Sequence, residues 1–444
     1  MCWDRVARVR CATHCQHVPE ALLTTMSDYR ATPATAIAPH EVRSPLEATP
    51  GRRGPPGDLP SVHLYTPSAD PSGMGAHMLC LADAYVREGR RVTLMYWPNA
   101  KAERLFAPAG ERGVRLARIP HPRDARFAAR IAEDLDRHPS DVFHLHVGTG
   151  RENWDAARAA AGSVRVPAIV QTLHLPWLIR NHHKRASALT ALEPVDRIIT
   201  VSHWQRATYE HMGVAAHRMV TVPNGVHPHT GSLGRDAARR ELGLRPEQPV
   251  VMTVGRLTVM KGHRYLVEAV PMLLERFPDL VVVVVGEGHL REVLEERART
   301  LGVAHAVRFP GHRTDARDLL AAADVFVLPS RHEGMPLAVL EAMDASLPVV
   351  GTRVIGTSEA VDDGVTGRLV APQDPTALAG AIDGLLGDPA LRRRMATAGK
   401  RRHEELFTAT RMARDTAEVY DEALAPKRTT GGGGEALGSA IMGG

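Results

Sequence analysis

Residues 324–342 read DVFVLPSRHEGMPLAVLEA. Four apolar residues at 325–328 are followed by a polar loop with proline and glycine, and then by a helical pattern that starts near residue 337. A short, continuous apolar run is typical of a strand that helices cover on both faces of a parallel sheet. The segment therefore predicts one strand–loop–helix unit of an α/β fold.

The same unit recurs on both sides of this segment. Short apolar strands alternate with amphipathic helices, and a polar stretch rich in Gly, Pro and His at 224–233 divides them into two sets. This alternation predicts the α/β class, with two doubly wound, Rossmann-like parallel-sheet domains facing across a cleft. The expected strands are 62–65, 92–96, 142–146, 168–172 and 197–201 in the first domain, and 250–254, 280–285, 307–309, 325–328, 348–352 and 368–370 in the second.

The domain boundaries follow from composition. Residues 1–60 hold 8 of the 32 prolines and no sustained apolar periodicity, which predicts a disordered extension. The first domain is expected at 61–230 and the second at 231–425, with a flexible Gly-rich tail at 426–444. The group formed by Cys11, His14, Cys15 and His17 matches no standard zinc-finger spacing, so we assign it to the extension.

The overall composition excludes several classes of protein. With 444 residues, 44% hydrophobic and 24% charged, the chain is unlike disordered, fibrous or disulfide-scaffold proteins. It contains no run of 18 uncharged apolar residues, so a transmembrane enzyme is excluded. Four cysteines, three of them in the first 15 residues, and the absence of a secretory signal favour a cytoplasmic protein. The net charge of +5 is a weak indication of anionic ligands and does not predict nucleic-acid binding.

Two carboxylates and a helix start lie where ligands bind in open α/β sheets. Glu333 lies in the loop at the carboxyl end of strand 325–328, and Glu341 follows eight positions later in the helix. The free N–H groups at Met335, Leu337 and Ala338 form an anion site, because a helix start carries partial positive charge. A phosphate fits there without a metal ion.

Two cations follow strand 250–254 in the same way. The strand is followed by Gly255 and Arg256, and then by Lys261 and Gly262. A guanidinium and an ammonium placed around a diphosphate would stabilise its negative charge as it leaves. The alternative is a pair of solvated surface cations, and the paired glutamates favour the diphosphate site.

Taken together, these motifs resemble the retaining glycosyltransferases of family 4, which have the GT-B fold. The similarity covers about residues 62–420 and rests on VGRL at 254–257, KG at 261–262, ADVFVLPS at 323–330, EGMPL at 333–337 and EAM at 341–343. The resemblance implies transfer of a sugar from a nucleotide diphosphate sugar to an acceptor hydroxyl of a glycan, lipid or small molecule. It implies a role in glycan biosynthesis, with no metal ion and no cofactor beyond the nucleotide sugar as co-substrate.

The resemblance also implies roles for single residues. Arg256 and Lys261 would bind the donor diphosphate and stabilise the departing phosphate, Glu333 would face the donor sugar, and Glu341 would hold the ribose hydroxyls. A carboxylate suits vicinal hydroxyls because it accepts paired hydrogen bonds. The other implied donor-binding residues in this half are Gly255, Gly334, Met335, Pro336 and Leu337.

The amino-terminal half contributes two further candidates. Gly73 and Gly75, after strand 62–65, resemble the family's glycine loop, in which the backbone approaches a diphosphate or acceptor group; an ordinary turn is the alternative. His174, after strand 168–172, resembles the family histidine that contacts the donor sugar, and His182 and His183 are nearby alternatives.

The chain departs from the family pattern at three places. His227 stands where Asp or Asn is usual, Ser346 stands where glycine is usual, and Ile355-Gly356 replaces a Gly-Gly pair. None removes a proposed diphosphate contact. They leave the donor base and the sugar open.

Other interpretations of the motifs have less support in the sequence. Gly286 and Gly288 lack the third glycine of a dinucleotide loop. Asp134 and Asp136 have the spacing of a metal-binding Asp-x-Asp, but they lie in a helical pattern, which predicts a solvated helix face and no metal site. Two rival functions are a GT-B sugar-nucleotide epimerase and a catalytically silent nucleotide-sugar binding protein.

The acceptor cannot be assigned from these residues. A basic cluster near the carboxyl terminus leaves open a peripheral contact with the inner face of a membrane, and a solvated helix face is the favoured alternative. The cluster consists of Arg392, Arg393, Arg394, Lys400, Arg401 and Arg402.

Overall fold

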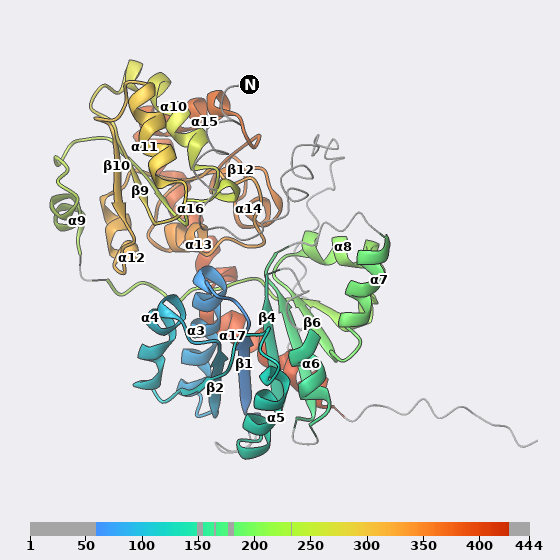
Figure 1. Ribbon diagram of the computed structural model, residues 1–444. Helices are drawn as coiled ribbons and strands as arrows, with labels where there is room; N and C mark the ends of the chain where they lie inside the picture. Colours follow the sequence, from blue (N-terminus) through green and yellow to red (C-terminus); the bar gives the residue numbers. More distant parts are fainter. Residues whose placement is uncertain (1–58, 149–153, 164–165, 176–181, 232, 426–444) are drawn as a thin grey trace, which may run out of the picture. The chain divides into compact units, whose positions relative to one another are not determined.

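The computed structural model describes residues 59–148, 154–163, 166–175, 182–231 and 233–425 (Figure 1). Nearly all of the expected extension at 1–60 and the tail at 426–444 lie outside these residues, as do Cys11, His14, Cys15 and His17. No helix in the described ranges is long and apolar enough to cross a membrane.

The first half of the chain forms a seven-stranded sheet in the order β3-β2-β1-β4-β5-β6-β7, with parallel pairing throughout. The strands are β1 (Val62–Thr66), β2 (Val92–Tyr96), β3 (Arg115–Arg118), β4 (Val142–Val147), β5 (Ala168–Leu173), β6 (Arg197–Thr200) and β7 (Met219–Thr221). The helices are α3 (Ser72–Arg87), α4 (Ala100–Gly110), α5 (Phe127–Arg137), α6 (Trp154–Ala161), α7 (His182–Ala191), α8 (His203–His211) and the short η2 (Ala216–Arg218).

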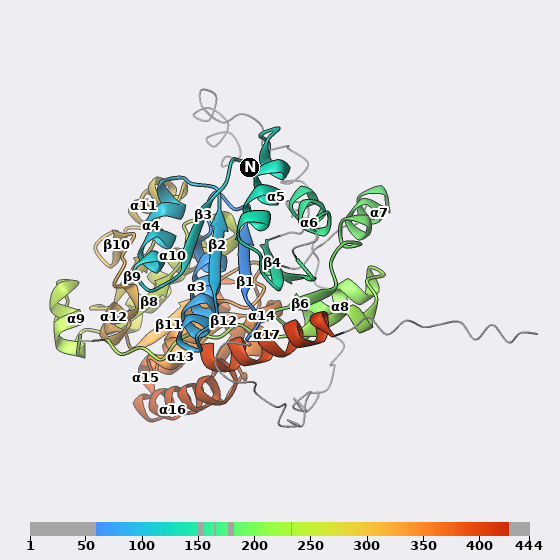
Figure 2. The ribbon, with the colours of Figure 1, turned by 90° about the horizontal axis from the view of Figure 1, so that it is seen from below.

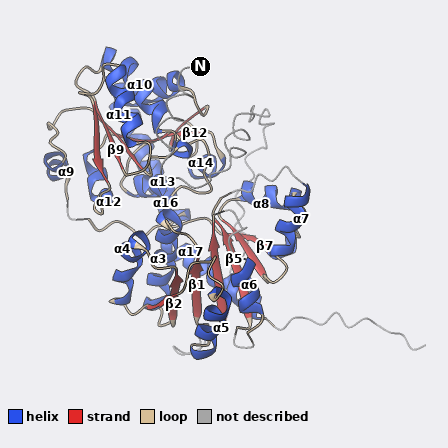
Figure 3. Cartoon of the chain, in the orientation of Figure 1, coloured by secondary structure: helices blue, strands red, loops and turns tan. Residues whose placement is uncertain are grey.

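The second half forms a six-stranded parallel sheet in the order β10-β9-β8-β11-β12-β13. Its strands are β8 (Val250–Val254), β9 (Val281–Val285), β10 (Val307–Gly311), β11 (Val325–Leu328), β12 (Val349–Thr352) and β13 (Gly367–Val370). Its helices are α9 (Arg235–Glu241), η3 (Val259–Lys261), α10 (His263–Arg276), α11 (Arg291–Thr300), α12 (Ala316–Leu319), η4 (Leu320–Ala322), α13 (Leu337–Asp344), α14 (Ile355–Ala360), α15 (Pro375–Gly387) and α16 (Pro389–Leu406). Figure 3 shows helices on both sides of the strands in each half. The prediction of two parallel-sheet α/β domains is confirmed.

The last helix, α17 (Ala409–Leu424), follows the second sheet in sequence but packs in the core of the first. It contacts α3, β5 and β6, and the views along and across the sheet place it beside α3 (Figures 1 and 2). Its Met412 and Tyr420 share one apolar cluster with Val62 and Leu64 of β1. Helix α17 therefore belongs by sequence to the expected second domain, 231–425, while its apolar side chains pack with the first sheet.

Two local elements differ from the sequence-based expectation. Strand β3 was not expected, because Arg115–Arg118 has no apolar run; it lies at the sheet edge and pairs with β2 alone. Helix α3 begins at Ser72, so Gly73 and Gly75, expected in a glycine loop, lie in the first turn of a helix. Pro71 precedes the helix and sets a backbone angle suited to its start.

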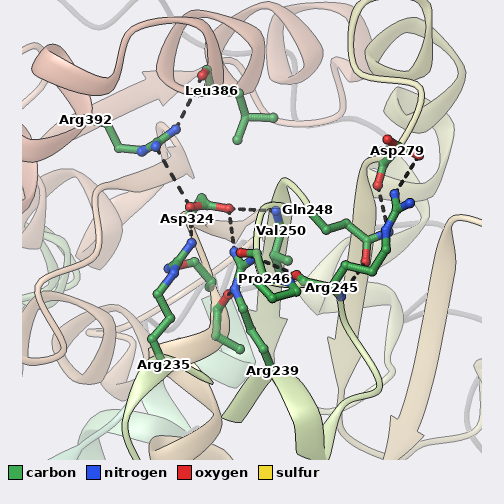
Figure 4. Close-up of polar contacts among 12 residues, drawn as sticks. Arg235, Arg239, Arg245, Pro246, Gln248, Val250, Asp279, Asp324, Leu386 and Arg392 are labelled. Carbon is green, nitrogen blue, oxygen red and sulfur yellow. Dashed lines mark hydrogen bonds and ion pairs between the residues drawn. The ribbon is translucent and has the colours of Figure 1, made fainter. Parts of the chain in front are cut away.

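Asp324, which directly precedes β11, forms polar contacts with β8, α9 and α16 (Figure 4). Its Oδ2 accepts hydrogen bonds from the Val250 N–H of β8 at 2.8 Å and from Arg239 of α9 at 3.1 Å. Its Oδ1 accepts from Arg235 at 2.7 Å, and Arg392 of α16 lies 3.9 Å away. The Arg239 side chain is 2% exposed, so Asp324 neutralises a buried charge.

We expect Asp324→Ala to lower the free energy of unfolding by about 3–5 kcal/mol, because it leaves the buried Arg239 guanidinium with carbonyl acceptors only. Asp279→Ala is the matched control. Asp279 pairs with Arg245, both side chains are more than 60% exposed, and its loss should change stability by less than about 1 kcal/mol. Chemical denaturation of both variants measures the difference, and equal effects would contradict this role of Asp324.

The basic cluster on α16 is partly used by the fold itself. Arg392 donates to the Leu386 carbonyl, Lys400 pairs with Asp344 at 2.6 Å, and Arg402 donates to two carbonyls at the end of α14. A hollow of about 690 Å³ beside it mixes four arginines with two carboxylates. Its residues include Arg393, Arg394, Arg401, Arg402, Asp362 and Glu405. The membrane contact stays a prediction.

Candidate active site

The turn between β8 and α10 carries Lys261 to the loop that follows β11. Gly262 has a φ of +65°, and a Cβ there would overlap the carbonyl oxygen of Pro329. The Arg331 N–H donates to the Met260 carbonyl at 2.8 Å, which joins the two segments. Glycine is therefore required at 262 for both its backbone angle and the close approach.

Lys261 and Glu333, predicted as separate site residues, form an ion pair. Lys261 Nζ lies 2.6 Å from Glu333 Oε1, and Ser330 Oγ donates to the same oxygen at 2.6 Å. The side chains of Lys261 and Glu333 are only 17% and 5% exposed. The pair therefore interacts where water screens it little, and a bound phosphate would have to compete with Glu333 for the ammonium group.

Arg256 lies next to a carboxylate that the sequence analysis missed. Its Nη1 is 3.8 Å from Asp70 Oδ2, and Lys101 Nζ is 2.8 Å from that same oxygen. A Cβ on Gly255 would be in ordinary van der Waals contact with His263 and Lys261, at 3.7–3.8 Å, so packing does not require glycine there. A donor contact at Gly255 stays a prediction.

Glu341 lies in the second turn of α13. Its side chain is 22% exposed, and Arg317 Nε lies 4.0 Å from its Oε1. Burial raises the pKa of Glu341 to about 7, against the opposing effect of Arg317. Arg317 was missed because α12 is distant in sequence and carries no motif.

The side chains of the other predicted residues between β11 and α13 have structural roles. Met335 is 5% exposed and belongs to the apolar core, and Leu337 packs against that core. Pro336 precedes the first residue of α13 and caps it without a side-chain hydrogen bond. A contact of the sugar donor with Met335 or Leu337 would therefore come from the backbone N–H groups at the helix start, and Pro336 has no N–H to contribute.

Gly334 brings His174 next to the Glu333 loop. A Cβ on Gly334 would overlap the carbonyl oxygen of His174, and a Cβ on Gly356 would overlap the carbonyl oxygen of Gly334. Three backbone segments therefore meet at van der Waals distance. Where the family usually has a Gly-Gly pair, this chain has Ile355-Gly356, and it keeps the glycine that the contact needs. Ser346, which stands where glycine is usual, adopts a left-handed φ of +57°. This backbone angle costs about 1–2 kcal/mol in a residue with a Cβ.

His174 lies directly after β5, as predicted, and its N–H donates to the Val147 carbonyl at 2.9 Å. Its Nε2 lies 3.3 Å from Nδ1 of His146. Burial, together with neighbouring histidines, holds the pKa of His174 well below its usual range, so the ring is neutral near pH 7. His182 and His183 begin α7, and their side chains are not described.

The two glycines of the amino-terminal half lie in the first turn of α3. A Cβ on Gly75 would overlap Leu105 and Pro71, so packing of α3 against α4 is enough to explain this glycine. Gly73 has no atom within 4 Å of its Cβ position. Open space at Gly73 agrees with an approach of a ligand, whose binding stays a prediction.

The competing motifs have structural explanations. Gly286 and Gly288 lie against the carbonyl oxygens of Gly255 and Leu257, where a side chain does not fit. The expectation of a solvated face was wrong for Asp134, which is 16% exposed and bonds Arg115 at 2.9 Å.

Two doubly wound parallel sheets, with cations and carboxylates gathered where strands β8 and β11 end, place the chain in the α/β class whose ligands bind at the carboxyl ends of the strands. Two family models match the chain: Glycosyltransferase Family 4 over residues 71–230 and Glycosyl transferases group 1 over residues 234–402. The chain belongs to the group 1 glycosyltransferases, with the GT-B fold.

Curated relatives agree with this assignment. The chain is 32% identical to a D-inositol 3-phosphate glycosyltransferase of Geodermatophilus obscurus over 352 residues, covering 72% of this chain and 76% of the relative. It is 29% identical to a glycogen synthase of Mycobacterium tuberculosis over 394 residues, covering 85% and 86%. An uncharacterised glycosyltransferase of Methanocaldococcus jannaschii is 27% identical over 379 residues, covering 79% and 95%.

Solved structures share the fold. HepE of Anabaena, in complex with UDP and glucose, matches with a TM-score of 0.72 at 20% identity, covering 82% of this chain and 99% of that chain. The lipopolysaccharide glycosyltransferase WaaG matches with a TM-score of 0.64 at 20% identity, covering 81% and 99%. At this identity the likeness establishes the fold alone.

Proposed function

We propose that this glycosyltransferase moves a sugar from a nucleotide diphosphate sugar to an acceptor hydroxyl with retention of anomeric configuration and without a catalytic metal ion. The observation that carries the proposal is the buried pairing of Lys261 with Glu333, at the ends of β8 and β11. It provides a cation for a leaving phosphate and a carboxylate for a sugar within one cluster.

The phosphates of the donor would bind between Arg256 and Lys261. Arg256 is 40% exposed and Lys261 is fixed by the Gly262 turn, so one cation can move to the ligand while the other is already positioned. A diphosphate that leaves between two cations needs no metal ion to offset its charge. The HepE structures contain UDP, UDP with glucose, and UDP-glucose, which supports UDP-sugars as the first donors to test.

The sugar and the ribose would be held by the carboxylates. Glu333 Oε1 already accepts two hydrogen bonds, which leaves Oε2 for sugar hydroxyls, and His174 lies on the neighbouring backbone segment. Glu341 would accept from both ribose hydroxyls. The relatives differ in their acceptors, since one is a glycogen synthase and another a D-inositol 3-phosphate glycosyltransferase.

The retention of configuration is inferred from the state of Glu333. A carboxylate that is paired with Lys261 and hydrogen-bonded to Ser330 is a weak nucleophile, which disfavours a covalent glycosyl-enzyme intermediate on Glu333. We infer substitution on a single face, in which the acceptor hydroxyl attacks from the side that the phosphate leaves and gives its proton to that phosphate.

A donor screen tests the function. The full-length protein is incubated with UDP-, GDP- and ADP-sugars, and thermal shift and release of nucleoside diphosphate are measured without added metal ion and with EDTA. We expect one nucleotide series to raise Tm and to be turned over in EDTA. Binding without turnover or isomerisation supports a silent binding protein, isomerised donor supports an epimerase, and no binding in any series contradicts the proposal.

The raised pKa of Glu341 predicts a pH dependence of donor binding. The ionised carboxylate accepts two ribose hydrogen bonds, and its protonated form begins to accumulate as pH falls through about 7. If only the ionised form binds, the donor KM should rise about tenfold between about pH 8 and pH 6. Glu341→Gln should have a high donor KM that no longer changes in this range, and an unchanged profile would contradict the assignment.

A further inference from the structure

Three histidine rings gather at the carboxyl end of the first sheet. His77 comes from α3, His146 from the end of β4, and His174 from the loop after β5. One ring nitrogen of each lies within 4.8 Å of the others. Among the described residues, no other group of three or more His, Cys, Asp or Glu side chains has this closeness.

We propose that His77, His146 and His174 bind a zinc-class transition-metal ion, and that this ion inhibits the enzyme by competing with the donor sugar. The binding stands on the geometry of the first half of the chain. The inhibition rests on the proposed function and on the contact between His174 and the donor sugar that the family resemblance implies.

The hydrogen bonds of His77 fix which nitrogen is available. Asn224 Nδ2 donates to the Met335 carbonyl at 2.8 Å, so Asn224 Oδ1 is the atom that faces His77 Nδ1 at 2.9 Å. An amide oxygen only accepts, so Nδ1 of His77 carries the proton and Nε2 carries a lone pair. Nε2 is buried and has no hydrogen-bond partner among the described residues. A histidine whose outer N–H is held by an oxygen is the usual arrangement of a metal ligand.

His146 and His174 already have the spacing of two ligands. Their Nδ1 and Nε2 atoms lie 3.3 Å apart. Two nitrogens bound to one tetrahedral zinc are about 3.3–3.4 Å apart, given Zn–N bonds of about 2.0–2.1 Å. Without a metal, these two nitrogens form a long hydrogen bond in which one ring is the donor, and an ion would replace that proton. No pair of the three is wider than 4.8 Å, so reaching the same spacing requires a closure of at most about 1.4 Å.

The chemistry of the three side chains suits a metal, because imidazole nitrogens are common ligands of zinc. The donor set of three imidazoles is that of an open zinc site, which keeps a fourth position for water or a ligand.

A fourth histidine supports the cluster without joining it. His144 lies behind His146, with ring centroids 4.1 Å apart. Its two nitrogens bond Tyr420 and Thr172, each at 2.7 Å. Both nitrogens are therefore used, and His144 fixes β4 against β5 and α17.

The position of His174 determines how an ion reaches the cluster and why it would compete with the donor sugar. It is only half-buried, whereas His77 and His146 are buried, so the cluster opens on the His174 side. An ion held there occupies the lone pair that His174 would offer to a sugar hydroxyl. A bound ion would thus exclude the sugar.

The test is a titration of the full-length, EDTA-treated protein with Co²⁺, followed by displacement with Zn²⁺. We expect a visible tetrahedral Co²⁺ spectrum without the near-ultraviolet band of thiolate ligands, which separates the cluster from the cysteines at residues 2, 11 and 15. His77→Gln should weaken binding about 100-fold or more, since it removes a ligand. Asn224→Ala should weaken it about 10- to 100-fold through the lost second contact.

His305→Ala, which removes an exposed histidine of the second half, is the matched control and should leave Co²⁺ affinity unchanged. Absence of the spectrum, a thiolate band, or equal affinity in wild type and in folded His77→Gln and Asn224→Ala would each overturn the site.

In steady-state kinetics, Zn²⁺ should raise the donor KM and leave kcat unchanged. If Co²⁺ binds but no donor is turned over, the proposed function fails and the metal site stands.

Discussion

Lys261→Ala is expected to lower kcat by about 10²–10³-fold, with a smaller change in the donor KM. The loss of one preorganised electrostatic contact to a developing charge has this size. Lys261 is suited to such a contact because the Gly262 turn fixes it, and because its side chain is only 17% exposed. Steady-state kinetics with the donor found in the screen measure the effect.

Two further variants separate catalysis from folding. Lys261→Ala also leaves Glu333 buried without its cation, so the melting temperature is measured in parallel, and Lys261→Ala/Glu333→Gln removes the unpaired charge. The double variant should regain stability but no activity. Arg264→Ala removes an exposed cation of α10 and should leave kcat unchanged. Near-normal turnover in folded Lys261→Ala would contradict the role in the leaving step.

Gly334→Ala is expected to lower kcat/KM by about 10²-fold or more. The added Cβ overlaps the His174 carbonyl oxygen, so the Glu333 loop or the His174 segment must shift. A shift of about 1 Å at a positioning residue can cost this much. The same kinetic assay measures the loss, and circular dichroism checks that the variant is folded.

Gly384→Ala is the control for this second change. Gly384 lies in α15, a Cβ there meets no atom within 4 Å, and alanine should stabilise the helix by up to about 1 kcal/mol without an effect on turnover. If Gly334→Ala is as active as Gly384→Ala, the three-segment contact does not position the site.

The central strands and the donor motif were predictable from sequence. Strand β8 has the expected bounds, and β9 and β11 differ by one residue at most, because runs such as Val281–Val285 are apolar on both faces. Lys261 and Glu333 were both expected after strands whose carboxyl ends face the ligand, but the ion pair between them was not predicted. Its exact partner atoms required the structure.

Other features of the fold and of the site could not be predicted, because no local sequence pattern indicates them. β3 is short and polar in pattern, and α17 has the same amphipathic pattern whether it packs on the second sheet or the first. Asp70 lies beside Arg256 through contacts between segments distant in sequence. His77 and His146 were missed for a similar reason, since one lies in a helix and the other in a strand, and their closeness to His174 exists only in the folded chain.

The central claim is transfer with retention from a nucleotide diphosphate sugar. Donor hydrolysis tests it without knowledge of the acceptor: the protein is mixed with the α-linked donor selected by the screen, and the anomer of the released sugar is read by proton NMR before mutarotation. Single-face substitution predicts that the α-anomer appears first. A first-formed β-anomer would contradict the account.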